Sequence, residues 1–447
     1  MTKKRQVISI AICVASILVL FGSCQKKEAA AGPGDAPKQV TLSFFTREPQ
    51  LAAVYDRINE AWYKKNPNVR IEMVHIPDND YDVKVDTTIL AGDALDICFF
   101  NNFPLYSVRA VQGEFASLDS YLAGEGIKFN DIYSIGATVD DGKIYGLPGD
   151  IKFSFVWINK NDLDKAGLPV PPLDWTWDDY REYAKKLTYG TGPNKHYGSM
   201  WFTWDHFNLW IPYNKMDGNP YLNPNGGHNL TNPAFVESLK LRYDLEQVDK
   251  TQIPMAEIFA MQLDYRSVFL SGRASMTITN TNMTPQIAQI TQFPHDFVTC
   301  FAPLPKPKDG RNGYTYADNR FYSIGQGSKN PQAAYDYLRF FTTEGIPLKN
   351  VTFTAEKVQK ISRNTMAESM IADNPSLFDL PSLQAVFSNP DLHENIWTYV
   401  PSYTTEVFTI YRAEADKAIN GEISFDQAIK NTIPQVESVL KREANKK

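Results

Sequence analysis

Residues 40–100 alternate between short apolar runs and longer amphipathic stretches, and this alternation limits the folds open to the chain. The runs VTLSFF, VRIEMVHI and LDICFF have the length and the β-branched and aromatic content of strands. After the first run, Leu51, Val54, Ile58 and Trp62 recur at helical spacing, and YDVKVDTTILAG supplies a second helix before the third run. The order strand–helix–strand–helix–strand predicts an α/β fold with a parallel sheet and helices packed on its faces.

Later segments carry further start signals for helices. Thr176 is well placed as the N-cap of a helix with Asp178 and Asp179 in its first turn. Asn330 is expected to cap another helix, whose first residue is Pro331. The last part of the chain is expected to be mostly helical, and the sequence shows no internal repeat.

The N-terminus has the pattern of a secretory signal. Basic residues at 3–5 precede an apolar stretch at 7–21, which is too short for a comfortable membrane span, and then Gly22, Ser23 and Cys24 follow. This pattern resembles the lipobox of bacterial lipoproteins, whose cysteine is lipidated and becomes the first residue of the mature chain. It predicts an extracytoplasmic protein held to the membrane by lipid on Cys24, in the periplasm or at the cell surface. The alternative is an ordinary secretion signal with an incidental cysteine.

Composition narrows the class of the remaining chain. Hydrophobic residues make up 43% and charged residues 21%, which are values of globular proteins with a sizeable core. The formal net charge is −6 without basic clusters, so nucleic acid is not expected as a partner. Cys98 and Cys300 lie far apart in apolar stretches, and we predict buried free thiols on strands, with a disulfide as the alternative.

Five segments, in the right order, resemble one family of proteins. They are KKNPNVRIEMV, ILAGDALDICFF, the long segment from GKIYGLPGDIKF to YAKKLT, FLSGRASMTIT and GSKNPQAAYDYLRFFTTEG. The third is the most specific, with matches at Gly146, Leu147, Pro148, Asn159, Lys160, Gly167, Pro172, Thr176 and Trp177. The chain resembles the extracellular solute-binding proteins of family 1, the carbohydrate-binding lipoproteins that serve ABC importers.

The resemblance implies a two-lobed α/β periplasmic-binding-protein fold, each lobe a mainly parallel sheet flanked by helices, with a ligand cleft between the lobes. Hinge closure would clamp the ligand. It also implies a monomer that is not an enzyme, needs no cofactor or metal, binds a sugar or polyol and passes it to ABC permease subunits. The expected parts are a signal peptide at 1–23, the lipidated cysteine and tether at 24–37, lobe 1 at 38–149 and 303–348, and lobe 2 at 150–302 and 349–447. The chain is expected to cross between lobes near 148–152 and 300–305.

The first candidate ligand contacts directly follow predicted strands. Ligands bind α/β sheets beyond the carboxyl ends of the strands, which points to Arg47 and Glu48 after the first strand. Phe100, Asn101 and Asn102 end or follow the third strand, where the family often has an aromatic and polar contacts. The alternatives are a mutual surface pair for Arg47 and Glu48, and helix capping for the asparagines.

The crossing and an aromatic segment supply further candidates. Asp150 and Lys152 lie on the expected crossing and face either the cleft or one another. In SMWFTWDHFNLWIP, the densest aromatic and polar patch, we predict Trp204, Asp205 and His206 as contacts. Sugars need flat aromatic platforms together with fixed polar groups. The alternative for each aromatic residue is a place in the core.

Two polar clusters come from the second half of the chain. Asn280 and Asn282 lie where many family members carry a glycine and then a tryptophan that stacks on sugar. No tryptophan follows here, so we expect a more polar subsite in place of that stacking contact. Asp318, Asn319 and Arg320 lie where the family usually has two glycines, and the Asp–Arg pair suits hydroxyl groups if it points inward.

NIWTYVPSY completes the set of candidates with Trp397, Tyr399 and Tyr403 as platforms. The mixture of carboxylate, amide and aromatic groups favours a neutral polyol. Other motifs are weak: DNDYD lacks the later residues of a calcium loop, and the six histidines show no zinc spacing. Two alternatives to transport are a secreted glycoside hydrolase, which needs two carboxylates across a cleft, and a sugar-sensing subunit of a receptor on the same fold.

Overall fold

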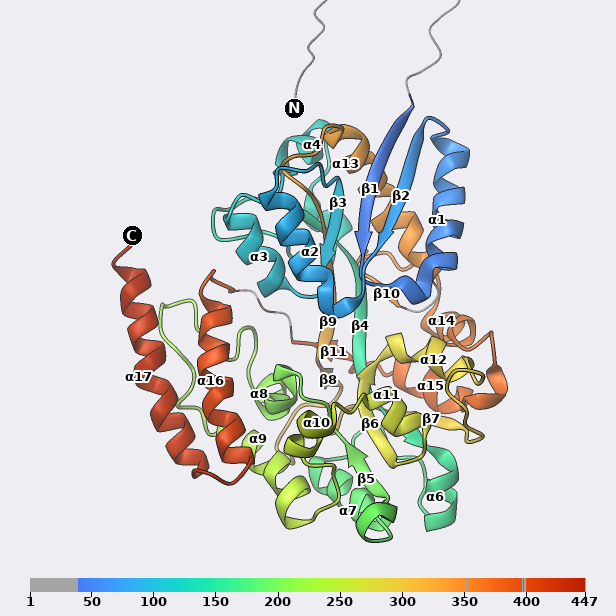
Figure 1. Ribbon diagram of the computed structural model, residues 1–447, viewed down its shortest axis with the longest axis vertical. Helices are drawn as coiled ribbons and strands as arrows, with labels where there is room; N and C mark the ends of the chain where they lie inside the picture. The colour runs from blue at the N-terminus through green and yellow to red at the C-terminus, as the bar shows by residue number, and fades with distance from the viewer. Residues whose placement is uncertain (1–38, 350–351, 396, 398, 447) are drawn as a thin grey trace, which may run out of the picture. The chain divides into compact units, whose positions relative to one another are not determined.

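The computed structural model describes residues 39–349, 352–395, 397 and 399–446 of the chain (Figure 1). The predicted signal peptide at 1–23, the predicted lipidation at Cys24 and the tether lie outside the described residues and stay predictions. From residue 39 onward the chain belongs to one compact unit.

The strands of the main sheet come from all parts of the chain. They are β1 (Val40–Thr46), β2 (Val69–His75), β3 (Ile97–Phe100), β4 (Gly146–Asn159), β5 (Tyr197–Met200), β6 (Ala274–Asn280), β7 (Thr299–Ala302), β9 (Ala317–Ile324) and β10 (Phe353–Thr354); β8 (Tyr314–Thr315) and β11 (His393–Glu394) form a separate pair. The order in the main sheet is β2-β1-β3-β9-β4-β6-β5, and β7 and β10 also pair with β4. The predicted parallel arrangement of β1, β2 and β3 is confirmed, with Val40 opposite Val69.

The strands β4 and β9 connect the two halves of the sheet. One part of β4, up to Phe153, pairs with β9, and its remainder pairs with β6 and β7. β9 also pairs with β3. The result is the predicted two-lobed α/β fold, with β1–β3 in one lobe and β5–β7 in the other. The sheet is mixed rather than mainly parallel, because β4 and β9 run antiparallel to their neighbours as they carry the chain between the lobes.

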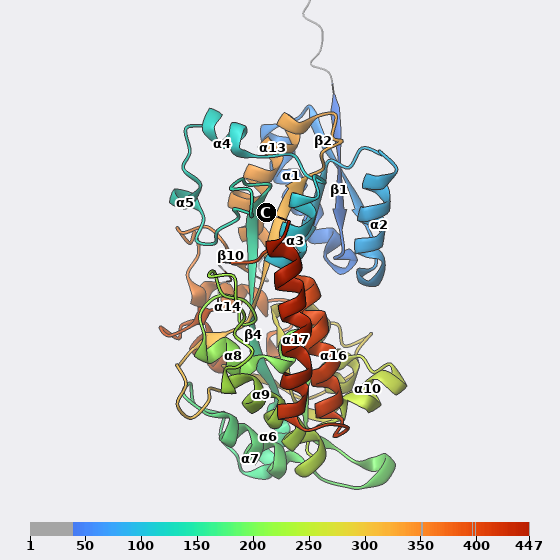
Figure 2. The ribbon, with the colours of Figure 1, turned by 90° about the vertical axis from the view of Figure 1, so that its left-hand side faces the viewer.

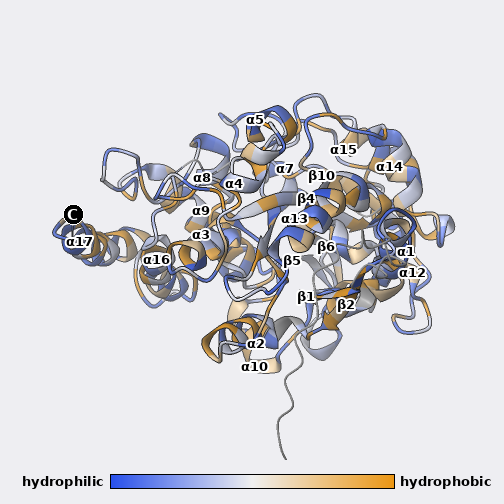
Figure 3. Ribbon diagram, turned by 90° about the horizontal axis from the view of Figure 1, so that it is seen from above, coloured by the Kyte–Doolittle hydropathy of each residue, from blue (hydrophilic) through white to orange (hydrophobic). Residues whose placement is uncertain are grey.

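Helices cover both halves of the sheet. They are α1 (Ala52–Lys65), α2 (Asp78–Leu90), α3 (Phe103–Val111), α4 (Asp119–Gly124), α5 (Phe129–Ile132), α6 (Lys160–Ala166), α7 (Trp177–Leu187), α8 (Trp210–Lys215), α9 (Pro233–Tyr243), α10 (Met255–Met261), α11 (Tyr265–Leu270), α12 (Thr284–Ala288), α13 (Pro331–Phe340), α14 (Arg363–Met370), α15 (Leu380–Phe387), α16 (Thr404–Ile419) and α17 (Phe425–Ala444). The predicted helices after the first two strands are therefore confirmed as α1 and α2. The helices carry both hydrophilic and hydrophobic residues along their length (Figure 3), as expected for helices that pack one face against the core and leave the other to solvent.

The predicted caps differ in how they are realised. Thr176 caps α7 through a capping box, in which its side chain and that of Asp179 bond reciprocally to backbone. Asn330 occupies the N-cap position of α13, but its side chain makes no capping hydrogen bond, and Pro331 is the first helical residue as predicted.

The segment after β7 contacts the lobe that contains α7 and α8. Trp175 donates its indole N–H to the carbonyl of Pro303 at 2.8 Å, and the backbone N–H of Trp177 reaches the carbonyl of Lys306 at 3.0 Å. Arg311 bonds to Asn214 of α8. The hydrogen bonds of residues 303–311 thus go to residues that we assigned to lobe 2, whereas the predicted boundary placed them in lobe 1. The strand that runs from one half of the sheet to the other here is β9, which begins at Ala317.

The two last helices, α16 and α17, lie side by side in both ribbon views (Figures 1 and 2). Tyr411 of α16 packs edge-on against Phe235 of α9, with ring centroids 5.3 Å apart. This contact anchors the helical pair to α9. None of the helices in the described part of the chain is both long and apolar enough to span a membrane.

Both cysteines of the described chain are buried free thiols, as predicted. Cys98 lies on β3 and Cys300 on β7. Burial raises the pKa of each thiol far above its ordinary value, so neither is reactive.

Candidate functional site

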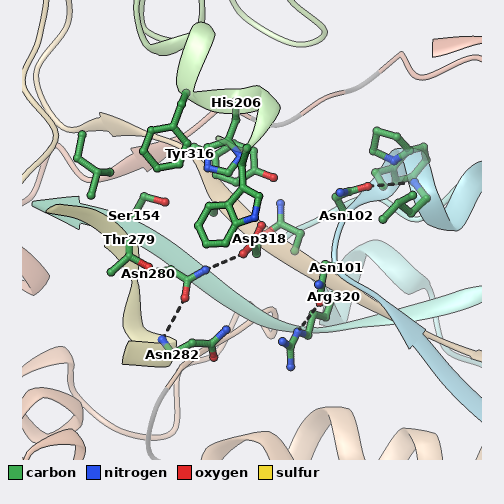
Figure 4. Close-up of a pocket in the computed structure, with 18 of the residues that line it drawn as sticks. Asn101, Asn102, Ser154, His206, Thr279, Asn280, Asn282, Tyr316, Asp318 and Arg320 are labelled. Carbon is green, nitrogen blue, oxygen red and sulfur yellow. Dashed lines mark hydrogen bonds between the residues drawn. The ribbon is translucent and has the colours of Figure 1, made fainter. Parts of the chain in front are cut away.

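A pocket of about 670 Å³ lies where the ends of β1, β3 and β6 meet β9. Twelve of the predicted contacts line it: Arg47, Glu48, Asn101, Asn102, Trp204, His206, Asn280, Asn282, Asp318, Asn319, Arg320 and Trp397. Figure 4 shows ten of the lining residues labelled. This volume falls in the range of small-molecule sites. The residues that line the pocket include both aromatic and polar side chains.

Five predicted contacts do not line the pocket. Phe100 is buried with the guanidinium of Arg109 over its ring, and Asp150 and Lys152 are buried behind the pocket wall. Tyr399 and Tyr403 hydrogen-bond to each other at 3.2 Å outside it. Their residue types suit a site, but Phe100, Asp150 and Lys152 point to the core side of their strands. The side chain of Asp205 is outside what the structure describes, so its role stays a prediction.

One wall of the pocket is charged and centres on Glu48 at the end of β1. Arg320 approaches its Oε2 at 2.5 Å, and Lys152 donates to its Oε1 at 3.1 Å. Tyr55 donates its hydroxyl to Oε2 at 2.7 Å. Burial by itself raises the pKa of Glu48, but the surrounding cations outweigh it and hold the pKa well below its ordinary value. Glu48 is therefore an ionised carboxylate whose two oxygens both have cationic partners. It does not form the surface ion pair with Arg47 that was the alternative.

Arg320 and Asp318 present polar groups to the pocket from the same strand. Arg320 donates its Nε–H to the Asn101 side-chain oxygen at 3.1 Å. Asn280 donates to the Asp318 carboxylate at 2.6 Å, and its own oxygen accepts from the backbone N–H of Asn282 at 3.0 Å (Figure 4). These bonds fix the side-chain amides of Asn101 and Asn280 and the carboxylate of Asp318, groups that can accept or donate hydrogen bonds.

The remaining predicted polar contacts have structural partners as well. Asn102 caps α3 by accepting from the N–H of Leu105 at 3.0 Å, which is the capping alternative, while the residue also lines the pocket. Arg47 pairs with Asp82 at 2.9 Å and lies over the ring of Tyr81. Both residues are thereby held rigidly at the pocket edge.

Another part of the pocket wall is aromatic. The rings of His206 and Tyr316 stack with centroids 4.1 Å apart and an interplanar angle of 7°. Trp204 also stacks with His206, with ring centroids 5.7 Å apart, and the ring of Tyr213 lies 5.5 Å from that of Tyr316 and 6.3 Å from that of Trp397. Burial lowers the pKa of His206 to about 3, so its imidazole is neutral. This row of rings offers apolar faces with polar edges to a ligand.

Asn319 links the pocket to the β8–β11 pair. Its side-chain N–H donates to Glu394 at 2.7 Å. Burial raises the pKa of Glu394 to about 7, only partly offset by this bond. Glu394 lies next to Asn395, which lines the pocket with Trp397.

Sequence reasoning missed several lining residues, among them Tyr316, Phe408 and Arg412. Tyr316 precedes Asp318 and Arg320 by two and four positions, so the two-residue period of a strand places all three on one face and could have identified it. Phe408 and Arg412 lie one helical turn apart on α16. Their spacing is a helical signal, but nothing in the local pattern shows that α16 reaches the pocket.

The fold and the pocket are those of a binding protein of the extracellular solute-binding class. The family model of bacterial extracellular solute-binding proteins matches residues 47–346, which is more than half of the chain. The chain therefore belongs to this family, whose members are extracellular binding proteins.

Relatives and solved structures agree with this assignment. A binding protein of Brucella abortus (strain 2308) is 26% identical over 318 residues, which are 70% of this chain and 74% of the relative. The structure of a sugar transporter protein from Rhizobium etli has a TM-score of 0.68 and 24% identity, covering 89% of this chain and 99% of that one. An ABC substrate-binding protein from Listeria monocytogenes, solved with cycloalternan, has a TM-score of 0.73 and 20% identity, covering 90% and 99%. At these identities the structures show a shared fold.

Proposed function

We propose that this protein captures a carbohydrate outside the cytoplasmic membrane and delivers it to an ABC importer. The observation that carries the proposal is one pocket lined both by a row of aromatic rings and by fixed amides and charged groups. A saccharide has apolar C–H faces and a rim of hydroxyl groups, so it needs both kinds of wall at once.

Family membership supports binding rather than chemistry. The Glu48 carboxylate is engaged by cations on both oxygens, which leaves it poorly suited to act as a general acid. We therefore expect the sugar to leave the protein unchanged. The Rhizobium etli protein is described as a sugar transporter and the Listeria protein holds cycloalternan, which supports a saccharide as the ligand class.

Capture and delivery require that the lobes move. The neighbouring strands β4 and β9 run between the lobes beside the pocket, so rotation about them would change its width. A ligand that contacts both lobes favours the closed form because it binds that form more tightly. We further propose that lipid on Cys24 holds the protein at the membrane, next to permease subunits that accept the closed form.

Thermal unfolding against a saccharide panel tests the proposal. The panel holds the monosaccharides glucose, mannose and arabinose, the trisaccharides maltotriose, mannotriose and arabinotriose, and cycloalternan, with polyamines and peptides as controls. A ligand at about 100 times its dissociation constant stabilises the native state by about 2.7 kcal/mol, which raises the midpoint by about 1–3 °C. A shift with one saccharide and none with its epimer supports the proposal, and chromatography of the recovered sugar checks that it is unchanged. Shifts confined to the peptides or polyamines would overturn it.

A further inference from the structure

Behind the pocket lies a cluster of ionised side chains that the sequence did not connect. This buried charge cluster comprises Glu48, Asp150, Lys152, Arg320 and Lys349, which come from the end of β1, from β4, from β9 and from the short 3-10 helix η7 (Ile346–Lys349). Each of these side chains is at most 3% exposed. Buried charges of this kind are costly unless every one is paired.

Lys349 joins the two carboxylates of the cluster. Its ammonium donates to Glu48 Oε2 at 3.0 Å and to Asp150 Oδ2 at 2.9 Å. Lys152 repeats the arrangement from β4, at 3.1 Å from Glu48 Oε1 and 3.5 Å from Asp150 Oδ2. The two lysines thus hold the Glu48 carboxylate from both of its oxygens, and neither lysine lines the pocket.

The front of this cluster is part of the pocket wall. Glu48 and Arg320 line the pocket together with Asp318, whose backbone is the strand partner of Lys152. Counted as ionised groups, Glu48, Asp318 and Arg320 carry two negative charges and one positive charge, and the layer behind them carries two ammonium groups and one carboxylate. The excess negative charge of these three groups is therefore balanced from behind by the lysines.

We propose that Lys349 and Lys152 are positioning residues of the ligand site, which orient Glu48 and Arg320 and offset the negative charge of the carboxylates beside the saccharide. Lys349 fixes Glu48, Glu48 fixes the Arg320 guanidinium, and Arg320 in turn holds the side chain of Asn101. Without Lys349 the surroundings of Glu48 and Asp150 lose one positive charge in a poorly solvated place, where charges interact strongly. A ligand carboxylate then meets more repulsion than its neutral counterpart.

The inference rests on the proposed function and is tested by calorimetric titration. The probes are maltotriose, mannotriose and arabinotriose, each as the neutral sugar and as the aldonate made by oxidising its reducing end. The proteins are the wild type, Lys349→Met, the conservative Lys349→Arg, and Arg181→Met as a matched control. Arg181 on α7 also pairs with two carboxylates, Asp244 at 3.0 Å and Asp249 at 2.8 Å, but does not line the pocket.

We expect Lys349→Met to weaken binding of the neutral sugar about tenfold or more, and Lys349→Arg and Arg181→Met to change it by less than about threefold. We also expect Lys349→Met to weaken binding of the aldonate by about threefold more than binding of the neutral sugar, because only the aldonate senses the added charge. A merely structural role would lower both affinities equally.

The outcomes separate the inference from the proposed function. If the wild type binds no saccharide, the proposed function fails and this inference fails with it. If the wild type binds but folded Lys349→Met keeps its affinity, or loses it equally for both forms of the sugar, only the inference is overturned. Should Lys349→Met not unfold cooperatively, Lys152→Met carries the same expectation through the other lysine, and equal losses for both forms of the sugar overturn it.

Discussion

Asn280 donates a hydrogen bond of 2.6 Å to the carboxylate of Asp318, and this bond joins β6 to β9 at the pocket. β6 belongs to one lobe, whereas β9 pairs with strands of both, so a movement of the lobes would change the geometry of this bond. Burial raises the pKa of Asp318, while nearby Lys152 and Arg320 oppose the rise. The carboxylate is thus oriented by an amide in the lining of the pocket.

Replacing Asp318 tests this role. We expect Asp318→Ala to weaken saccharide binding by about 1.5–3 kcal/mol, about 10- to 150-fold, because a hydrogen bond to a charged acceptor is lost. The thermal midpoint of the unliganded protein should change little, because the side chain is partly exposed. Calorimetric titration checks the affinity, and Asp217→Ala, at an exposed carboxylate paired with Arg311, is the control. Equal affinities for Asp318→Ala and the wild type would remove Asp318 from the site.

The aromatic wall makes a separate prediction. Trp204 stacks toward His206 at 5.7 Å and meets Tyr265 edge-on at 5.1 Å, and the indole lines the pocket. We expect Trp204→Leu to weaken saccharide binding about tenfold and to reduce the change in tryptophan fluorescence on binding.

The matched control for this change is Trp62→Phe. Trp62 packs against Tyr337 at 5.3 Å and does not line the pocket, so its loss should leave the fluorescence response intact. A response that survives in Trp204→Leu and disappears in Trp62→Phe would contradict the assignment of the aromatic wall.

Local patterns were enough to predict the first half of the fold. The helical spacing of Leu51 to Trp62 and the apolar runs on either side gave α1, β1 and β2, because each of these elements is decided by its own residues. The crossing at 148–152 was predicted from the resemblance and falls within β4. The mixed character of the sheet was not predicted, since strand direction at β4 and β9 depends on how the chain returns from distant segments.

The site shows the same division between local and distant causes. The rule that ligands lie beyond strand ends led to Arg47, Glu48 and Asn101, which line the pocket. The partners of Glu48 were not predictable, because Lys349 lies 301 positions away in the chain. The two alternatives for Asp150 and Lys152 were left open by the sequence, and in the structure these residues face one another.

His206 gives a prediction about pH and stability. Its imidazole has a pKa lowered to about 3 by burial, so the folded state keeps it neutral while the unfolded state takes up a proton below about pH 6.5. The contribution of His206 to stability is therefore present above that pH and is lost as the pH falls toward about 3. We expect urea unfolding to show a steeper loss of stability on acidification in the wild type than in His206→Gln. Parallel pH profiles of the two proteins would contradict the neutral, poorly solvated state of this ring.

Glu394 gives the opposite dependence. Its pKa is raised to about 7 by burial, so the folded state binds a proton between about pH 4.3, the ordinary value, and pH 7, where the unfolded state does not. The stability that this group contributes is full below about pH 4.3 and is lost as the pH rises through 7. Glu394→Gln keeps an acceptor for Asn319 without the charge. We expect its thermal midpoint to exceed that of the wild type at about pH 8 and to approach it at about pH 4, where the wild-type side chain is largely protonated in both states and resembles the glutamine. A variant that is less stable than the wild type at the higher pH would show instead that the charged carboxylate is the form that Asn319 requires.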